Sequence, residues 1–165
     1  MRDTGGLNIM LTGNNIALRL LVEDDVAQVC EWRNMPENAA LFFRQRIEPE
    51  SFLREIQEIR NSESEEIFAI AERESGAILG TLSYEIRRGS GELYATLGIM
   101  IGSKYARGKG RGTEAISLIT EYLYKNRGVK NIVVEVKPGN SLAIAFYEKL
   151  GFRTKSVIMS KNTGE

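Results

Sequence analysis

The sequence of 165 residues contains no histidine and a single cysteine. Without histidine the chain cannot build a serine-histidine-aspartate triad, and it lacks the commonest side-chain ligand of zinc. It offers no tight carboxylate cluster with ligand spacing either, so we expect no metal site. Cys30 cannot form an internal disulfide, and its apolar neighbours Val26, Val29 and Trp32 predict a buried place on a helix.

An excess of charge of one sign and long apolar runs are lacking as well. The chain has 22 basic and 22 acidic residues, so no overall field points to nucleic acid or a membrane as a partner. The apolar island from Leu7 to Leu11 is too short for a signal-peptide core or for a span of about 20 residues. We therefore expect a cytoplasmic protein with one domain over residues 1–165, comprising a leader at 1–15 and a polar tail at 160–165.

The most informative feature that is present is a basic, glycine-rich run between a strand and a helix. It reads Arg107, Gly108, Lys109, Gly110, Arg111, Gly112, Thr113. Glycines leave backbone N–H groups free to point at one anion, and the helix N-terminus adds partial positive charge. The spacing fits neither a Walker loop nor the dinucleotide fingerprint. The run therefore predicts a phosphate cradle, and the simpler interpretation is a turn that only connects two elements.

Apolar periodicity and turn residues predict a chain of alternating strands and helices. We expect helices from about Asp24 to Trp32, after Pro49, from the glycine-rich run to Gly128, and from Asn140 or Ser141 to Leu150. The expected strands are 16–21, 67–71, 78–86, 93–101 and 132–136, with another starting at Phe152. Short loops at 74–76 and 87–91 favour antiparallel hairpins.

Two spaced motifs make the sequence resemble the GNAT superfamily of N-acetyltransferases. Arg107, Gly110 and Gly112 match its pyrophosphate-binding signature, Arg/Gln-x-x-Gly-x-Gly/Ala. A later pattern, Asn-x-x-Ala-x-x-x-Tyr-x-Lys-x-Gly-Phe, is matched by Asn140, Ala143, Tyr147, Lys149, Gly151 and Phe152. The resemblance covers about residues 16–157. Segments 31–34, 97–102 and 112–115 are similar to the branch with ribosomal-protein-alanine and sugar-amine acetyltransferases.

The resemblance implies an α/β fold with a mixed α+β sheet, the GNAT fold. Three layers, α-β-α, would surround a mostly antiparallel sheet, with its fourth and fifth strands (Leu93 to Ile101 and Ile132 to Lys137) splayed to admit the cofactor arm. Little chain remains after Phe152 for the family's further strand. Either the chain is trimmed or naturally short, or a second copy completes the sheet edge, in which case a homodimer through residues 152–159 is the simplest assembly.

The implied activity is transfer of an acetyl group from acetyl-CoA to a primary amine. Backbone N–H groups from Gly108 to Thr113 would hold the pyrophosphate, with Arg107, Lys109 and Arg111 nearby. The pantetheine arm would pair with Ile99, Met100 and Ile101 like an added strand, and Ile99 or Met100 N–H would polarise the thioester carbonyl. Asn140, Phe146 and Tyr147 would border the arm, although Phe146 is equally consistent with core packing.

The resemblance gives Tyr147 the role of protonating the departing thiolate; the alternative is a packed tyrosine whose hydroxyl reaches solvent. Because the chain has no histidine, the base is a carboxylate, a tyrosine or water. Thr96 stands where the branch often has glutamate, so that residue's role does not carry over. Glu135 is a better candidate for the base than Glu92, because its flanking valines could desolvate its carboxylate. For both residues the alternative is a solvated or salt-bridged charge without a catalytic role. The identity of the acceptor amine stays open, and we expect its pocket around Trp32 to Phe43. The acceptor is either a small molecule or, in a further alternative, a peptide or protein that the enzyme modifies. The alternative function is a CoA or acyl-CoA sensor without turnover.

Overall fold

The computed structural model of the protein describes residues 10–41 and 46–156. The chain forms two compact units, Met1–Glu135 and Val136–Glu165. The first unit contains the whole sheet and the glycine-rich run, and the second contains the helix with the second motif. The expectation of one domain over the full chain stays a prediction.

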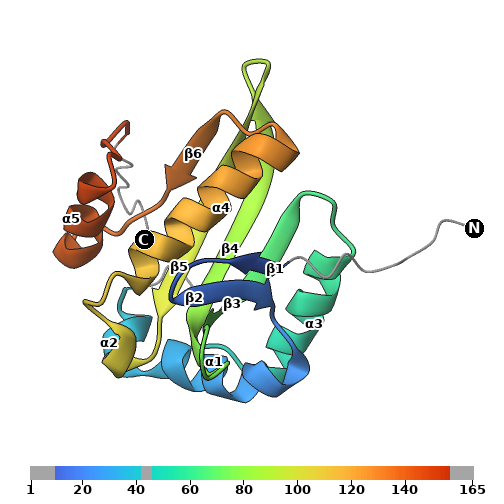
Figure 1. The fold of residues 1–165 in the computed structure, drawn as a ribbon, viewed down its shortest axis with the longest axis vertical. Coiled ribbons are helices and arrows are strands. Elements are labelled where there is room, and N and C mark those ends of the chain that lie inside the picture. Colours follow the sequence, from blue (N-terminus) through green and yellow to red (C-terminus); the bar gives the residue numbers. More distant parts are fainter. Residues whose placement is uncertain (1–9, 42–45, 157–165) are drawn as a thin grey trace, which may run out of the picture. The chain divides into compact units, whose positions relative to one another are not determined.

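One mixed sheet of six strands organises the first unit (Figure 1). The strands lie side by side in chain order: β1 (Met10–Thr12), β2 (Ile16–Leu20), β3 (Glu65–Glu72), β4 (Ile78–Gly89), β5 (Glu92–Ile101) and β6 (Asn131–Val134). All neighbours are antiparallel except β5 and β6, which are parallel because α4 connects them. The expected mixed, mostly antiparallel sheet is confirmed.

Helices cover both faces of this sheet. The helical elements of the first unit are η1 (Glu23–Asp25), α1 (Val26–Asn34), α2 (Pro36–Ala39), α3 (Pro49–Arg60), η2 (Lys104–Ala106) and α4 (Arg111–Arg127). Helix α4 packs on β2 and β5, while α3 packs on β3 and on α1. Side chains alternate along β3, so Ile67 and Ala69 join the α1–α3 core and the buried Phe68 and Ile70 face the α4 side. The expected three layers are therefore present.

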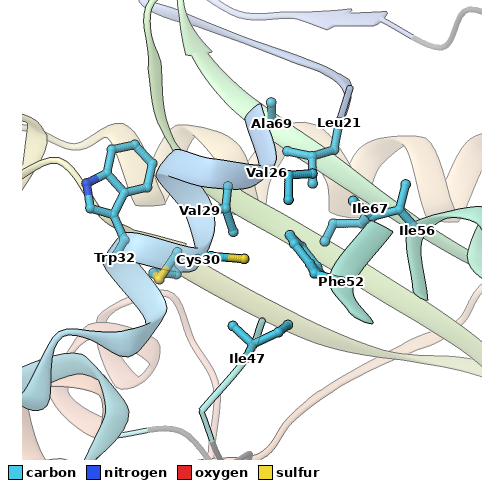
Figure 2. Packing of buried hydrophobic residues seen from close by; sticks show 11 residues of the cluster. Leu21, Val26, Val29, Cys30, Trp32, Ile47, Phe52, Ile56, Ile67 and Ala69 are labelled. Atoms are coloured by element: carbon cyan, nitrogen blue, oxygen red, sulfur yellow. The ribbon is translucent and has the colours of Figure 1, made fainter. Parts of the chain in front are cut away.

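The core between α1, α3 and the sheet follows from helical spacing (Figure 2). On α3, Phe52 and Ile56 are one turn apart and both buried. On α1, Val29 and Cys30 face the same core, which confirms the buried helical position predicted for the cysteine. Trp32 lies on the side of the cluster away from Phe52 and Ile56 in Figure 2. Through Trp32 and Met100 the core extends to the end of β5.

Several boundaries differ from those expected. The loop predicted at 87–91 is only a two-residue turn, because Gly89 pairs with Glu92 and both Ser90 (φ 47°) and Gly91 (φ 91°) are left-handed, as a tight hairpin requires. Strand β1 and the short helix α2 were not predicted, since each has too few residues to show a period. Strand β6 is shorter than the predicted 132–136 and ends at Val134.

The second unit is built around α5 (Ser141–Lys149). Its start is confirmed, with the Asn140 side chain accepting a hydrogen bond from the Ala143 N–H. At its end, Gly151 (φ 88°) donates to Glu148 O and Phe152 donates to Tyr147 O, the pattern of a Schellman motif. The strand predicted from Phe152 is wrong for residues 152–156, because the Phe152 N–H closes the helix; its continuation at 157–159 lies outside the described residues.

Candidate cofactor and acceptor site

One edge of β5 is paired with β6 only along the first part of the strand. Pairing with β6 runs from Tyr94–Asn131 to Leu97–Val134 and stops there. The last four residues, 98–101, continue to pair with β4 through Gly98–Ser83 to Ile101–Gly80. No other described strand pairs with β5 on the β6 side. The sheet therefore opens where the sequence led us to expect a splay.

The direction of the backbone groups along this open edge can be read from three contacts. Lys130 N–H donates to Leu93 O at 2.9 Å, and Arg107 Nε donates to Ile101 O at 2.9 Å, so both carbonyls point away from β4. The Met100 carbonyl instead lies against Gly80 on β4, where a Cβ on Gly80 would overlap it. Because backbone groups alternate in direction along a strand, Ile99 shares the outward direction of Leu93 and Ile101. Of the two N–H groups considered as thioester donors, Ile99 points outward and Met100 points inward.

The glycine-rich run follows β5 after residues 102–106, which include η2, and it leads into α4. Gly108 (φ 70°) and Gly110 (φ 74°) are left-handed, and an added Cβ at either would meet no atom within 4 Å. The need for glycine is therefore conformational, and the space beside the loop is open. No side chain caps α4, whose first intrahelical bond runs from Glu114 N to Gly110 O. The N–H groups of residues 111–113 are thus those that a helix leaves without partners, as a phosphate cradle requires.

Glu114, which the sequence analysis did not single out, fixes this helix start to the sheet. Its carboxylate accepts from Asn15 N at 2.8 Å, Asn15 Nδ2 at 3.0 Å and Ile16 N at 3.4 Å. Partial burial acts to raise the pKa of Glu114, but the hydrogen bonds from Asn15 and Ile16 outweigh it and hold that pKa below its usual value. A Cβ on Gly13 would overlap the carboxylate, so a larger residue there would displace the Glu114 side chain. The only sign of this contact in the sequence is the run Gly13, Asn14, Asn15 before the first predicted strand.

Arg107 is held between β5 and α2. Besides the bond to Ile101 O, its guanidinium donates to Asn38 Oδ1 at 3.2 Å. Asn38 is buried and donates through Nδ2 to Trp32 O at 2.7 Å. Nothing in the sequence marked Asn38, because its role depends on residues that lie far away along the chain.

A hollow of about 430 Å³ lies next to the end of β5, on the α1 side of the sheet. It is lined by Trp32, Met35, Ile78, Gly102, Ser103, Lys104 and Tyr105. The Trp32 ring lies directly on Gly102, where any Cβ would overlap it. Lys104 at the rim pairs with Glu37 at 3.2 Å. Two residues of the stretch in which the acceptor pocket was expected, Trp32 and Met35, line this hollow, and Phe43 lies outside the described residues.

The two carboxylates considered as bases are placed differently. Glu92 begins β5 beside the hairpin and lies near Asn131 Nδ2 at 3.4 Å. Seven residues of extended strand, about 23 Å, separate it from Ile99, so the structure does not bring Glu92 to the open edge. Glu135 comes directly after the last paired residue of β6, Val134, and is exposed. The desolvation expected from its flanking valines is not found.

In the second unit, Tyr147 is enclosed by aromatic rings. Phe146 and Phe152 meet it edge to face, with ring centroids 5.1 and 5.3 Å away. Burial raises the pKa of Tyr147 to about 12. The hydroxyl is therefore a proton donor throughout the neutral range. Asn140 acts as the helix cap, and Phe146 is half-buried.

Within residues 10–41 and 46–156, no three histidine, cysteine or carboxylate side chains gather as metal ligands could. No helix in that part of the chain is long and apolar enough to cross a membrane.

Comparison with known proteins gives a consistent result. A family model described as an acetyltransferase (GNAT) domain matches residues 15–153. An uncharacterized N-acetyltransferase of Bacillus subtilis, YobR, is 33% identical over 85 residues, which are 52% of this chain and 32% of that protein. The chain thus spans about a third of the length of the curated relatives it matches.

Solved structures show the same fold. A GNAT-family acetyltransferase from Bacillus anthracis superposes with a TM-score of 0.75 at 17% identity, covering 90% of this chain and 86% of the other. The aminoglycoside acetyltransferase AAC(6')-Ib in complex with coenzyme A gives a TM-score of 0.71 at 21% identity, with 86% of each chain covered.

Proposed function

Because this chain belongs to the acetyltransferase (GNAT) family, whose acetyl donor is acetyl-CoA, we propose that it transfers the acetyl group of acetyl-CoA to a primary amine. The acceptor is the amine of a small molecule or of a protein N-terminus. The observation that carries the proposal is the open edge of β5, which is followed along the chain by η2, the glycine-rich run and an uncapped helix start. Pantetheine amides and the pyrophosphate of one CoA molecule match these two features in that order.

In this proposal the cradle binds the pyrophosphate through backbone N–H groups of residues 108–113. Lys109 and Arg111 add positive charge beside it, and Thr113 is exposed on the first turn. The pantetheine arm pairs with the open edge through the Ile99 carbonyl and the Ile101 N–H, as an added strand would. The Met100 N–H takes no part, since it points to β4.

The chemical step is attack of the neutral amine on the thioester carbonyl, which forms the C–N bond and breaks the C–S bond. The outward N–H of Ile99 polarises that carbonyl and stabilises the oxyanion, because a donor fixed by a strand needs little reorganisation. Tyr147 gives its proton to the departing thiolate. The proton of the amine passes to water, since the carboxylate of Glu135 is exposed and Glu92 is remote. Much of the rate then comes from holding the two reactants together.

We place the acceptor entrance at the hollow lined by Trp32 and Tyr105. The hollow adjoins Gly102, which directly follows the last residue of the open edge. An acceptor lodged there approaches β5 from the α1 side of the sheet. Initial rates with aminosugars, polyamines, aminoglycosides and peptide N-termini would identify its class.

The proposal is tested by calorimetry of CoA binding to the wild type and to Gly110→Asp. The substitution places a carboxylate beside the pyrophosphate and should weaken binding by at least about a hundredfold. Gly91→Asp is the matched control, because Gly91 is also left-handed and open but lies in the hairpin at the other end of β5. Equal CoA affinity in folded Gly110→Asp would contradict the cradle, and CoA binding without steady-state release of CoA in the amine panel would favour a sensor.

A further inference from the structure

Asn38 occupies an unusual position for an amide on a four-residue helix. Its side chain is only 5% exposed, and both ends of the amide are used. Nδ2 donates to the Trp32 carbonyl on α1, and Oδ1 accepts from Arg107, which is 69 residues away in sequence. A buried amide that is satisfied at both ends holds its partners in one geometry, because breaking either bond leaves a buried polar group unpaired.

The Asn38 contact also helps to determine the orientation of the Arg107 guanidinium. Nε donates to the Ile101 carbonyl at 2.9 Å, and one terminal nitrogen donates to Asn38 at 3.2 Å. The guanidinium is planar and its donors form a rigid fork, so bonds from two of its nitrogens to two different partners fix the orientation of the group. Ile101 is the last residue of the open edge, and Arg107 is the first residue of the glycine-rich run. Arg107 therefore ties the end of the edge to the start of the cradle.

From these contacts we propose that Arg107 is a positioning residue, oriented by Asn38, that holds the open edge of β5 and the cradle in register for the two parts of CoA. Its guanidinium acts through the Ile101 carbonyl, and its charge is not what retains the pyrophosphate. The chain of bonds from Trp32 through Asn38 and Arg107 to Ile101 also links the wall of the hollow to the cofactor edge. The inference rests on the proposed CoA site.

The test uses two substitutions that remove the same charge from Arg107. In Arg107→Gln, the amide nitrogen occupies the place of Nε and can still donate to Ile101 O; in Arg107→Met, a side chain of similar length has no donor. We expect Arg107→Gln to weaken CoA binding by about threefold and Arg107→Met by about tenfold or more, as lost hydrogen bonds do. Neither should change the salt dependence of the dissociation constant. Asn38→Ala should weaken binding by about threefold to tenfold, also without changing the salt dependence.

Lys109→Gln is the comparison for charge, since Lys109 is exposed in the cradle itself. It should weaken CoA binding and reduce its salt dependence, because a screened charge is lost. Urea unfolding and Trp32 fluorescence of each variant establish that it is folded before binding is measured. Equal losses in Arg107→Gln and Arg107→Met, with a reduced salt dependence, would overturn the positioning role in favour of a direct phosphate contact. Wild-type affinity in Asn38→Ala would overturn the part assigned to Asn38, whereas a wild type that binds no CoA would contradict the proposed function as well.

Discussion

At the scale of single residues, Tyr147 carries the clearest chemical expectation. Its pKa is raised to about 12 by burial, so the phenol keeps its proton across the neutral range, as a group that protonates a thiolate must. We expect Tyr147→Phe to lower kcat about a hundredfold with little change in CoA affinity. Assays of CoA release measure kcat, and calorimetry measures the affinity for CoA.

Glu135→Gln is the companion measurement for the proton of the amine. If that proton passes to water, kcat stays within about threefold of the wild type and the pH profile is unchanged. A loss of tenfold or more at neutral pH would instead assign the base to Glu135. Unchanged turnover in Tyr147→Phe would remove the acid role from the tyrosine.

Asp25 provides a residue-scale prediction about stability. Burial acts to raise its pKa, but hydrogen bonds from Arg19 and the Val22 N–H prevail and lower it. Both Asp25 oxygens accept from Arg19, at 2.7 and 2.9 Å. A carboxylate whose pKa is lower in the folded state stabilises the fold above its unfolded pKa, near 3.9, and loses that contribution as the pH falls through the folded value.

We therefore expect Asp25→Asn to lower the free energy of unfolding by about 1–3 kcal/mol at neutral pH, a range for charged hydrogen bonds with one partly exposed partner. The difference from the wild type should shrink as the pH falls below about 4. Urea titrations at several pH values measure it. A difference that grows on acidification would show that the Arg19–Asp25 pair is not its source.

At the scale of elements, the contact of α1 with the end of β5 shapes the hollow. The indole of Trp32 lies on Gly102, so Gly102→Ala must displace one of them. Because Trp32 is the sole tryptophan of the sequence, its emission reports on this contact. We expect a shifted emission maximum and a raised acceptor KM in Gly102→Ala, with CoA affinity changed less than threefold. Unchanged acceptor kinetics would place the acceptor elsewhere.

The position of the α4 N-terminus depends on a contact with the loop before β2. Glu114 joins the first turn to the loop before β2, while Gly128 (φ 68°) ends the helix in a left-handed residue. The seventeen residues of α4 are thus anchored at their N-terminal end, where the helix dipole places its partial positive charge. This contact holds the start of α4, and with it the end of the glycine-rich run, against the beginning of β2.

At the scale of the whole molecule, the proposed assembly is a homodimer. A further strand was expected from Phe152 onwards, and residues 152–156 form none. Completion of the sheet by a second copy predicts self-association through residues 152–159, of which 157–159 lie outside the described residues. Sedimentation velocity from low to high micromolar concentration should show a dimer that Ile158→Lys weakens. Monomer alone at high micromolar concentration would contradict the proposed dimer.

The sequence by itself determined the family resemblance, the order of strands and helices, and the position of the glycine-rich run before a helix. These depend on local patterns: left-handed glycines before a helix, alternation in strands, and an asparagine that caps α5. Such features act within a few residues and can be read without knowing the fold. The buried helical position of Cys30 was predictable for the same reason.

The tertiary structure alone decided which groups meet. The choice of Ile99 over Met100 depends on which side of β5 each backbone group faces, and only the contacts of this strand with its neighbours show that. The exposure of Glu135 and the distance of Glu92 depend on strand ends, which local propensity fixes poorly. Asn38 and Glu114 act on partners 69 and 99 residues away, respectively. Their hydrogen bonds exist only because the sheet and helices bring those segments together, and a pattern read along the chain does not contain that information.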